Sequence, residues 1–254
     1  MHRIVIPARH ASSRFPGKPL VAIAGKPMLQ WVYERACASG AAQIVIATDD
    51  ESIAAAARAF GAEVCMTAVT HQSGTDRIAE VARRGGWAAD SIVVNVQGDE
   101  PLIEPAAISQ VAELLQASAT AGIATLAAPI RSLEAFLDPN VVKVVADPTG
   151  RALYFSRAPI PWGRDGAAAG LASQSRFDGA RRHIGLYAYR ADALQRLSAL
   201  PPSPLELLER LEQLRALEAG IEIRVADSRI EPGPDVNVPQ DVERVAAVLL
   251  ARQR

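Results

Sequence analysis

Short runs of apolar, mostly β-branched residues alternate with helical patterns in the first half of the chain. Such runs predict strands at Arg3–Ile6, Gln43–Thr48, Glu63–Met66, Ser91–Val96 and Ile123–Ala128. Apolar residues at helical spacing predict helices at Met28–Ser39, Asp50–Phe60, Gly74–Arg84 and Pro105–Ser118. Strands separated by helices indicate a doubly wound, mainly parallel, Rossmann-like α/β sheet with helices on both faces.

The second half of the chain is less regular. Two strands, Val141–Ala146 and Ala152–Phe155, form a predicted hairpin around the turn sequence DPTG, and residues 157–180 predict a mobile surface loop. Further on, the pattern predicts strands at His183–Tyr189 and Glu222–Ala226 and helices at Leu205–Ala219 and Gln240–Arg252. We therefore predict a single domain over residues 1–254, with a smaller β-rich and loop-rich insertion at about 131–185.

Composition excludes some classes of protein. The chain has 27 basic and 28 acidic residues, and this balance argues against a broad nucleic-acid surface. No apolar run reaches the roughly 18 residues of a membrane span, and the N-terminus lacks a signal-peptide pattern. Cys37 and Cys65 have no metal-binding spacing, so we expect two buried thiols in a cytoplasmic protein.

The connection after the first predicted strand is unusually long and basic. It runs from Pro7 to Pro27, whereas such connections are commonly about two to six residues long. Arg9, Arg14 and Lys18 supply three cations at the carboxyl edge of the sheet, which suits a triphosphate. Neither a P-loop nor a dinucleotide fingerprint is present, and a solvated loop with incidental charges stays an alternative.

Two further polar loops are predicted at the same edge. HQSGTDR, at 71–77, leads into a helix, where exposed amides favour an anionic or polar group, although Ser73 or Thr75 could equally serve as an N-cap. NVQGDEP, at 95–101, follows an apolar predicted strand that stops at Gly98, where a glycine lets the backbone turn sharply. Asp99 is a candidate oxygen ligand to Mg²⁺, although it could instead cap the turn at Pro101.

These three segments together resemble a known family. IPARHASSRFPGKPL, HQSGTDR and NVQGDEP, in this order, are similar to segments of the 3-deoxy-manno-octulosonate (Kdo) cytidylyltransferases, or CMP-Kdo synthetases. Later segments agree: KVVADPTGRALYFSRAPIPW, RHIGLYAYR and SPLELLERLEQLR. The opening segment alone is shared with many nucleotidyltransferases, whereas the combination of the others is more specific to the Kdo enzymes.

The resemblance implies the nucleotide-diphospho-sugar transferase fold and a Mg²⁺-dependent transfer of CMP from CTP to the anomeric hydroxyl of Kdo. Pyrophosphate is released, and the activated Kdo serves lipopolysaccharide synthesis. A homodimer is expected, with no nucleic-acid or membrane partner. Two rivals stay open: the same transfer to another acid sugar, such as 8-amino-Kdo or a sialic acid, and a nucleotide-binding protein without turnover.

The family's residue roles carry over to matching positions. Catalytic roles are implied for Arg9, Lys18 and Asp99. Contacts with the nucleotide are implied for Ala8, Arg9, Ser12, Arg14, Lys18, Gln72, Ser73, Gly74 and Arg77. Contacts with Kdo are implied for Gln97, Arg157, His183, Tyr187, Glu206 and Gln213.

Physical arguments accompany two pairs of the implied sugar ligands. Arg157 and His183 are reasonable partners for the Kdo carboxylate, because charge-assisted bonds recognise carboxylates well. Glu206 and Gln213 are seven residues apart, so on one helix they would lie two turns apart on one face.

One position departs from the family pattern. Where the family is expected to read Val-Asp-Thr-Pro-x-Asp, this chain has VNVPQD at 236–241, so the implied second protein ligand to Mg²⁺ is Asn237. An amide oxygen can bind Mg²⁺ but carries no charge. Asp235, two residues earlier in an extended segment, faces the same side and is the alternative source of that charge.

We predict that metal binding is retained but weakened by this departure. Asn237→Asp should lower the Mg²⁺ concentration needed for half-maximal turnover, because it restores a charged ligand. Asp235→Ala should raise that concentration. Mg²⁺ titrations of turnover check both variants, and the second-ligand hypothesis fails if neither changes the requirement.

Overall fold

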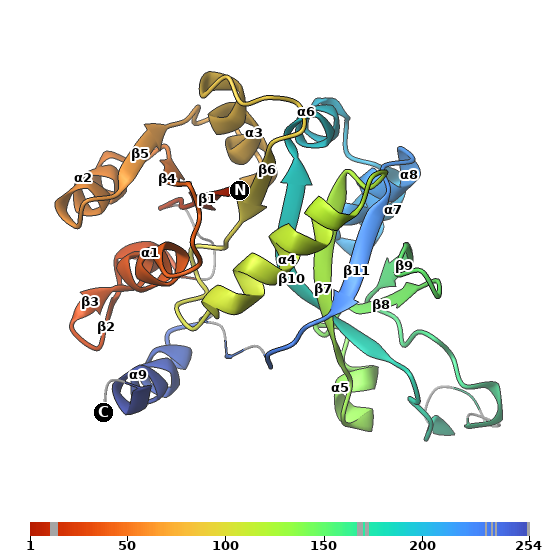
Figure 1. The fold of residues 1–254 in the computed structure, drawn as a ribbon. Helices are drawn as coiled ribbons and strands as arrows, with labels where there is room; N and C mark the ends of the chain where they lie inside the picture. The colour runs from red at the N-terminus through yellow and green to blue at the C-terminus, as the bar shows by residue number, and fades with distance from the viewer. Residues whose placement is uncertain are drawn as a thin grey trace.

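The computed structural model describes residues 1–10, 15–166, 170, 173–231, 233–234, 236 and 238–252. Within these ranges the centre of the fold is a nine-stranded sheet with the main order β11-β7-β10-β6-β1-β4-β5 (Figure 1). The strands of this path are β1 His2–Pro7, β4 Gln43–Thr48, β5 Glu63–Met66, β6 Ile92–Asn95, β7 Ile123–Pro129, β10 Arg181–Arg190 and β11 Ile223–Asp227. A hairpin of β8 Lys143–Ala146 and β9 Ala152–Ser156 attaches to β10.

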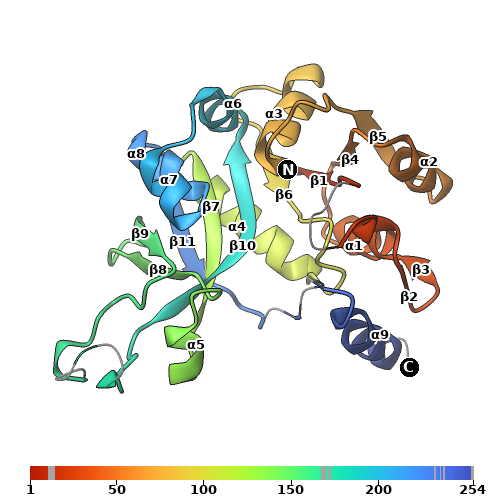
Figure 2. The ribbon, with the colours of Figure 1, turned by 180° about the vertical axis from the view of Figure 1, so that it is seen from behind.

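Helices cover both faces of the sheet. The first face packs against α1 Met28–Cys37, α2 Glu51–Ala59 and α4 Pro105–Ala117. The opposite face packs against α3 Gly74–Arg84, α6 Ala191–Ala199 and α8 Gln213–Glu218. Helix α4 lies in front of the strands in Figure 1 and behind them in Figure 2. Alternate residues of β1 explain the two layers, because Ile4 and Ile6 enter the first core and Val5 enters the second.

Smaller elements complete the fold. A short hairpin, β2 Ala22–Ile23 with β3 Lys26–Pro27, packs with α9 Asp241–Arg252 on a separate apolar cluster that includes Met28 and Trp31. The remaining elements are the helices α5 Leu133–Leu137 and α7 Pro204–Glu209 and the 3₁₀ turns η1 Lys18–Leu20 and η2 Arg164–Gly166. Among the described residues, none of the helices has both the length and the apolar character that crossing a membrane requires.

The direction of the strands decides where loops gather. β1 is parallel to β4 and β6, with Val5 opposite Val45 and Asn95, so the loops that follow these strands leave from one edge. The predicted mainly parallel sheet is therefore confirmed. Along the main path of the sheet β10 is the exception, because it runs antiparallel between β6 and β7. Its first residues, from Arg181 onward, consequently lie at the carboxyl edge of its neighbours.

Several local predictions are wrong. The helix expected at Leu205–Ala219 is two helices, α7 and α8, because Arg210 adopts a left-handed conformation with φ 54° between them. Glu206 and Gln213 therefore do not share one helical face. The sequence analysis also missed α5, α6 and the β2–β3 hairpin. Cys37 is exposed and Cys65 is only partly buried, contrary to the expectation of two buried thiols.

Candidate active site

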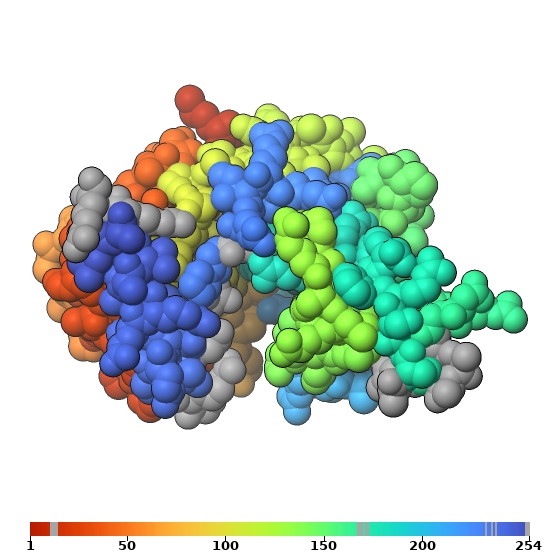
Figure 3. Space-filling model, turned by 90° about the horizontal axis from the view of Figure 1, so that it is seen from below, coloured from red at the N-terminus to blue at the C-terminus, as the bar shows by residue number. Residues whose placement is uncertain are grey.

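The loops after β1 and β6 and the start of α3 enclose a cavity at the carboxyl edge. Its volume is ≈ 220 Å³, and we call it the cationic cavity. It is lined by Pro7, Ala8, Arg9, Lys18, Pro19, Gly74, Arg77, Gln97, Gly98 and Asp99. Seen from this edge, the molecule is deeply hollowed between α9 on one side and α5 with the start of β10 on the other (Figure 3). Three cations face one carboxylate in this lining, so the cavity favours an anionic ligand.

An ion pair between Lys18 and Asp99 ties three distant segments together. Lys18 Nζ lies 2.5 Å from Asp99 Oδ2 and donates to the carbonyl of Val236 at 3.0 Å. The Val236 N–H in turn donates to the Asp99 carbonyl at 3.3 Å. The chain therefore passes beside Asp99 at Val236, between the two candidates for a second metal ligand.

Four of the predicted site residues cannot be placed. Ser12, Arg14, Asp235 and Asn237 lie outside the described residues. Their implied roles stay predictions.

Gly98 allows the loop after β6 to approach the loop after β1. A Cβ atom at this position would lie 3.0 Å from the carbonyl oxygen of Pro7, closer than ordinary van der Waals contact. The absence of a side chain at Gly98 thus permits the neighbouring Gln97 and Asp99 to reach the cationic cavity.

The start of α3 is built by capping. Ser73 is the N-cap: its Oγ accepts from the Asp76 N–H at 3.1 Å, and Asp76 Oδ2 accepts from the Ser73 N–H at 3.1 Å. The predicted N-cap is therefore present at Ser73, while Gly74, the first helical residue, lines the cationic cavity. Gln72 is exposed and donates to the carbonyl of Thr70 at 3.1 Å.

Arg77 lines the cationic cavity, but its guanidinium already has partners within the protein. Nη2 lies 2.6 Å from Asp49 Oδ2, and Nη1 donates to Thr67 Oγ1 at 2.7 Å. Arg77 is only 4% exposed. Its contacts therefore hold the loop before α3 against β4, and its implied contact with the nucleotide stays a prediction.

A second cavity, of ≈ 100 Å³, adjoins the first. It shares Gly74 and Gln97 with the cationic cavity, and we call it the polar cavity. Its lining is Gly74, Thr75, Asn95, Gln97, Ile123, Tyr187, Tyr189, Leu197, Glu212 and Gln213. Three predicted sugar ligands, Gln97, Tyr187 and Gln213, are thus brought together on separate elements of the fold.

Two buried polar atoms in the polar cavity have no hydrogen-bond partner among the described residues. They are Asn95 Oδ1, an acceptor, and Gln213 Nε2, a donor, on side chains that are 3% and 8% exposed. An unpaired buried polar group is costly, so these two residues of the lining are candidates for contact with a ligand that both donates and accepts. A sugar hydroxyl does both.

Glu212 also lines the polar cavity, and with Asn95 it was missed as a site residue. Burial raises the pKa of Glu212, against the opposing effects of Thr75 and Arg215. A sequence signal existed for each residue, because Asn95 ends the buried run SIVVN and Glu212 directly precedes Gln213. Neither signal distinguishes a residue that contacts a bound molecule from one that only forms hydrogen bonds within the protein.

Three other predicted sugar ligands do not line either cavity. Arg157 donates from Nε to the Glu209 carbonyl at 2.7 Å and from Nη1 to the Pro139 carbonyl at 2.9 Å. Glu206 accepts from the Ser203 N–H at 3.1 Å, completing the cap of α7, and lies 3.2 Å from Arg215 Nε. His183 contributes to a separate cavity of ≈ 100 Å³ on the α4 side of the sheet.

His183 is uncharged at neutral pH. Burial, with the ring 5.0 Å from Phe155 and 5.2 Å from Tyr187 between centroids, lowers its pKa to about 3. The Thr125 hydroxyl has one proton and donates to the carbonyl of Ile184 or Leu186, so it accepts the proton of His183 Nε2 at 2.9 Å. A contact of His183 with a substrate carboxylate would therefore be a neutral hydrogen bond, not an ion pair.

The lowered pKa of His183 predicts acid sensitivity. Below the ordinary value of 6.5 the unfolded chain binds a proton that the folded protein refuses, so stability falls as the pH decreases toward 3. His183→Asn should reduce the loss of unfolding free energy between about pH 7.5 and about pH 5 by about 1–2 kcal/mol. Urea unfolding at both pH values measures this difference. An unchanged loss in His183→Asn would contradict the assignment.

The parallel sheet with cation-bearing loops at its carboxyl edge defines a nucleotide-binding α/β protein. More particularly, the family model for cytidylyltransferases matches residues 3–223, and the chain belongs to this family. Two relatives carry the name 3-deoxy-manno-octulosonate cytidylyltransferase. The one from Thioalkalivibrio sulfidiphilus is 54% identical over 98% of this chain and 99% of its own length. The one from Pseudomonas syringae pv. syringae is 56% identical over 97% of each chain.

Solved structures agree with this assignment. A CMP:2-keto-3-deoxy-manno-octonic acid synthetase complexed with CTP is similar with a TM-score of 0.88 and 44% identity, covering 99% of this chain and 100% of the other. A 4-diphosphocytidyl-2C-methyl-D-erythritol synthase, 14% identical with a TM-score of 0.63, shares the fold; the alignment covers 98% of this chain and 99% of the other. The predicted nucleotide-diphospho-sugar transferase type of fold is thereby confirmed.

Proposed function

We propose that the chain transfers CMP from CTP to the anomeric hydroxyl of Kdo and releases pyrophosphate. The observation that carries this function is the junction of the two cavities at Gly74 and Gln97. One cavity is cationic, as a triphosphate requires, and the other holds an unpaired donor and acceptor, as a polyhydroxylated sugar requires. The relatives named for this activity support the same substrates.

The proposed chemistry follows from the shared wall of the cavities. The anomeric oxygen attacks the α-phosphorus of CTP, the bond from that phosphorus to the bridging oxygen breaks, and pyrophosphate leaves while the hydroxyl proton passes to solvent. Reactions of this type depend on charge neutralisation and in-line positioning. Arg9 and Lys18 supply the neutralising charge, and Gln97 lies where the sugar and the nucleotide meet.

We assign Mg²⁺ to Asp99. Its carboxylate is 34% exposed and is the one carboxylate in the described lining of the cationic cavity. One or two carboxylates with substrate phosphates make a typical Mg²⁺ site, so the residues present fit the ion. Bound there, Mg²⁺ would neutralise phosphate charge during the transfer. Asn237 or Asp235 is the proposed second protein ligand, and both flank Val236, which contacts Asp99.

We also propose that the enzyme acts in the cytoplasm, where CTP is available, and that it forms a homodimer. Exposed apolar side chains support a dimer: Leu153 on β9 is 53% exposed and Trp162 in the following loop is 43% exposed. Both belong to the segment at about 131–185 that the sequence analysis singled out.

The decisive experiment measures pyrophosphate released from CTP when Kdo is added. Release with Kdo supports the proposal, release only with 8-amino-Kdo or a sialic acid supports a different acceptor, and no release with any acid sugar supports a binding protein without turnover. Lys18→Ala should lower kcat/KM by about 100-fold or more, because it removes a preorganised cation where charge develops. Lys26→Ala, which loses an ion pair with Glu34 and a cation–π contact with Trp31 away from both cavities, is the matched control and should retain activity. Near-normal turnover by Lys18→Ala would overturn the triphosphate assignment.

A second prediction concerns Gln213 and separates binding from stability. Gln213→Leu should raise the KM for Kdo by about tenfold, because a donor to the sugar is lost, while the unfolding free energy stays equal or rises. Gln110→Leu is the matched control: this glutamine is equally buried but fully engaged, donating to the Asp227 carbonyl and accepting from the Arg229 N–H. It should lose stability and keep its KM. An unchanged KM for Kdo in Gln213→Leu would exclude the polar cavity as the sugar site.

A further inference from the structure

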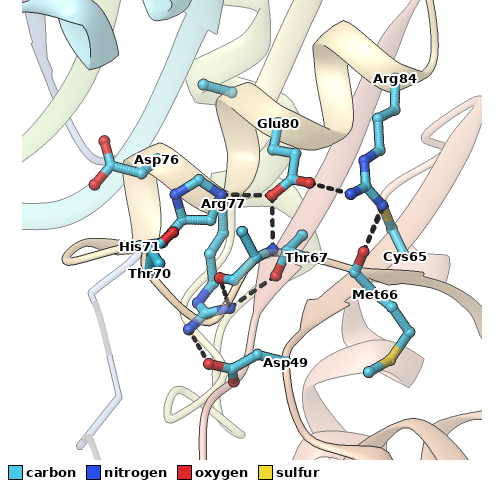
Figure 4. A network of polar contacts seen from close by, with 12 residues as sticks. Asp49, Cys65, Met66, Thr67, Thr70, His71, Asp76, Arg77, Glu80 and Arg84 are labelled. Carbon is cyan, nitrogen blue, oxygen red and sulfur yellow. Dashed lines mark hydrogen bonds and ion pairs between the residues drawn. The ribbon is translucent and has the colours of Figure 1, made fainter.

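A buried carboxylate outside both cavities organises the loop that precedes α3. Glu80, on α3, is 4% exposed. Its Oε2 accepts from the Ala68 N–H at 2.9 Å and lies 2.5 Å from His71 Nε2, while Oε1 pairs with Arg84 (Figure 4). Three donors therefore converge on one buried carboxylate, and two of them belong to the loop.

The loop at 67–73 depends on side chains of α3 for its shape. At its start Thr67 donates to the Thr48 carbonyl, and within it the His71 N–H reaches the Ala68 carbonyl only at 3.5 Å. Arg77 and Glu80, at helical spacing on α3, contact this loop, and Arg84, one turn further on, contacts Met66 directly before it, as Figure 4 shows. Arg77 donates to Thr67 and also to Asp49, which follows β4. Glu80 accepts from Ala68 and His71. Arg84 donates to the Met66 carbonyl at 2.6 Å.

The loop ends where both cavities begin. His71 is followed by Gln72 and by Ser73, the N-cap of α3, and Gly74 lines the cationic and the polar cavity. Any displacement of His71 therefore moves the residues that enter the nucleotide site. Glu80 itself lines neither cavity, so it acts on the site indirectly, and its contacts with Ala68 and His71 give it a route through the loop.

We propose that Glu80 is a positioning residue for the nucleotide, which holds the 67–73 loop in its binding conformation through Ala68 and His71. This role rests on the proposed function, because it assumes that the cationic cavity receives CTP. The carboxylate is suited to this role because all three of its partners are donors. Burial by itself raises the pKa of Glu80, but the bonds from Ala68, His71 and Arg84 outweigh that effect and lower it. The group consequently stays ionised at neutral pH.

The test is the isosteric variant Glu80→Gln in the full chain. A glutamine keeps the size of the side chain but carries no charge, so even with its oxygen toward Ala68 and His71 it binds them more weakly, and its NH₂ group then faces the donor Arg84. We expect the KM for CTP to rise by about tenfold or more, with kcat at saturating CTP within about threefold and a much smaller rise, below about threefold, in the KM for Kdo. A side chain that merely stabilised the fold would not produce this split, which affects mainly the nucleotide.

The matched control is Gln195→Leu. Gln195 donates to the carbonyl of Ala79, the residue before Glu80, but it contacts α3 from α6 and not the loop. This variant should lose stability with no change in the KM for CTP. If Glu80→Gln is too unstable to assay, His71→Leu removes the same contact from the loop side and should show the same selective rise.

The outcomes separate the two proposals. If the wild-type protein releases no pyrophosphate from CTP with Kdo, the proposed function fails. If the wild type is active and both Glu80→Gln and His71→Leu keep the wild-type KM for CTP, the positioning role of Glu80 is wrong. An equal rise in the KM for CTP and for Kdo would also overturn it, since that result indicates a general loosening of the site.

Discussion

The parallel pairing of β1 with β4 and β6 is the constraint on which the site depends. Because these strands point the same way, the loops that follow them must leave from one edge, although they are far apart in the chain. Lys18 and Asp99 can then meet as an ion pair across two of these loops, and Val236 joins them from the C-terminal part. Without the shared strand direction, three polar loops would be three isolated surface features.

The parts of the fold that local pattern determines were predictable. Runs such as QIVIAT and SIVVN are buried and β-branched, and the structure has strands there. The reversal of β10 was not predictable, because an antiparallel strand between parallel neighbours carries no local signal. The break between α7 and α8 at Arg210 was not predictable for a related reason. The residue in the left-handed conformation is an arginine, whereas a glycine at this position would have indicated the end of a helix.

The sequence predicts which residues are candidates for the site, but it does not predict whether their side chains are free to bind a ligand. Motifs predict which polar residues lie at a sheet edge, but they do not show which of these residues already form hydrogen bonds or ion pairs within the protein. Arg77 is paired with Asp49 on another strand end, and Glu206 is paired with Arg215 on another helix. Asn95 and Gln213, by contrast, keep buried atoms without partners among the described residues. Such distinctions depend on tertiary neighbours, which a single sequence does not display.

Because β10 runs opposite to β6 and β7, the two cavities take some of their residues from different parts of the chain. The cationic cavity is lined by the loops that leave the ends of β1 and β6 and by the start of α3, whereas Tyr187 lines the polar cavity from β10. The two cavities share Gly74 and Gln97, and the polar cavity also takes Thr75 from α3 and Asn95 from β6. The residues that line only the polar cavity, among them Tyr187 and Tyr189 of β10, can therefore vary in evolution while the loops after β1 and β6 keep the cationic cavity.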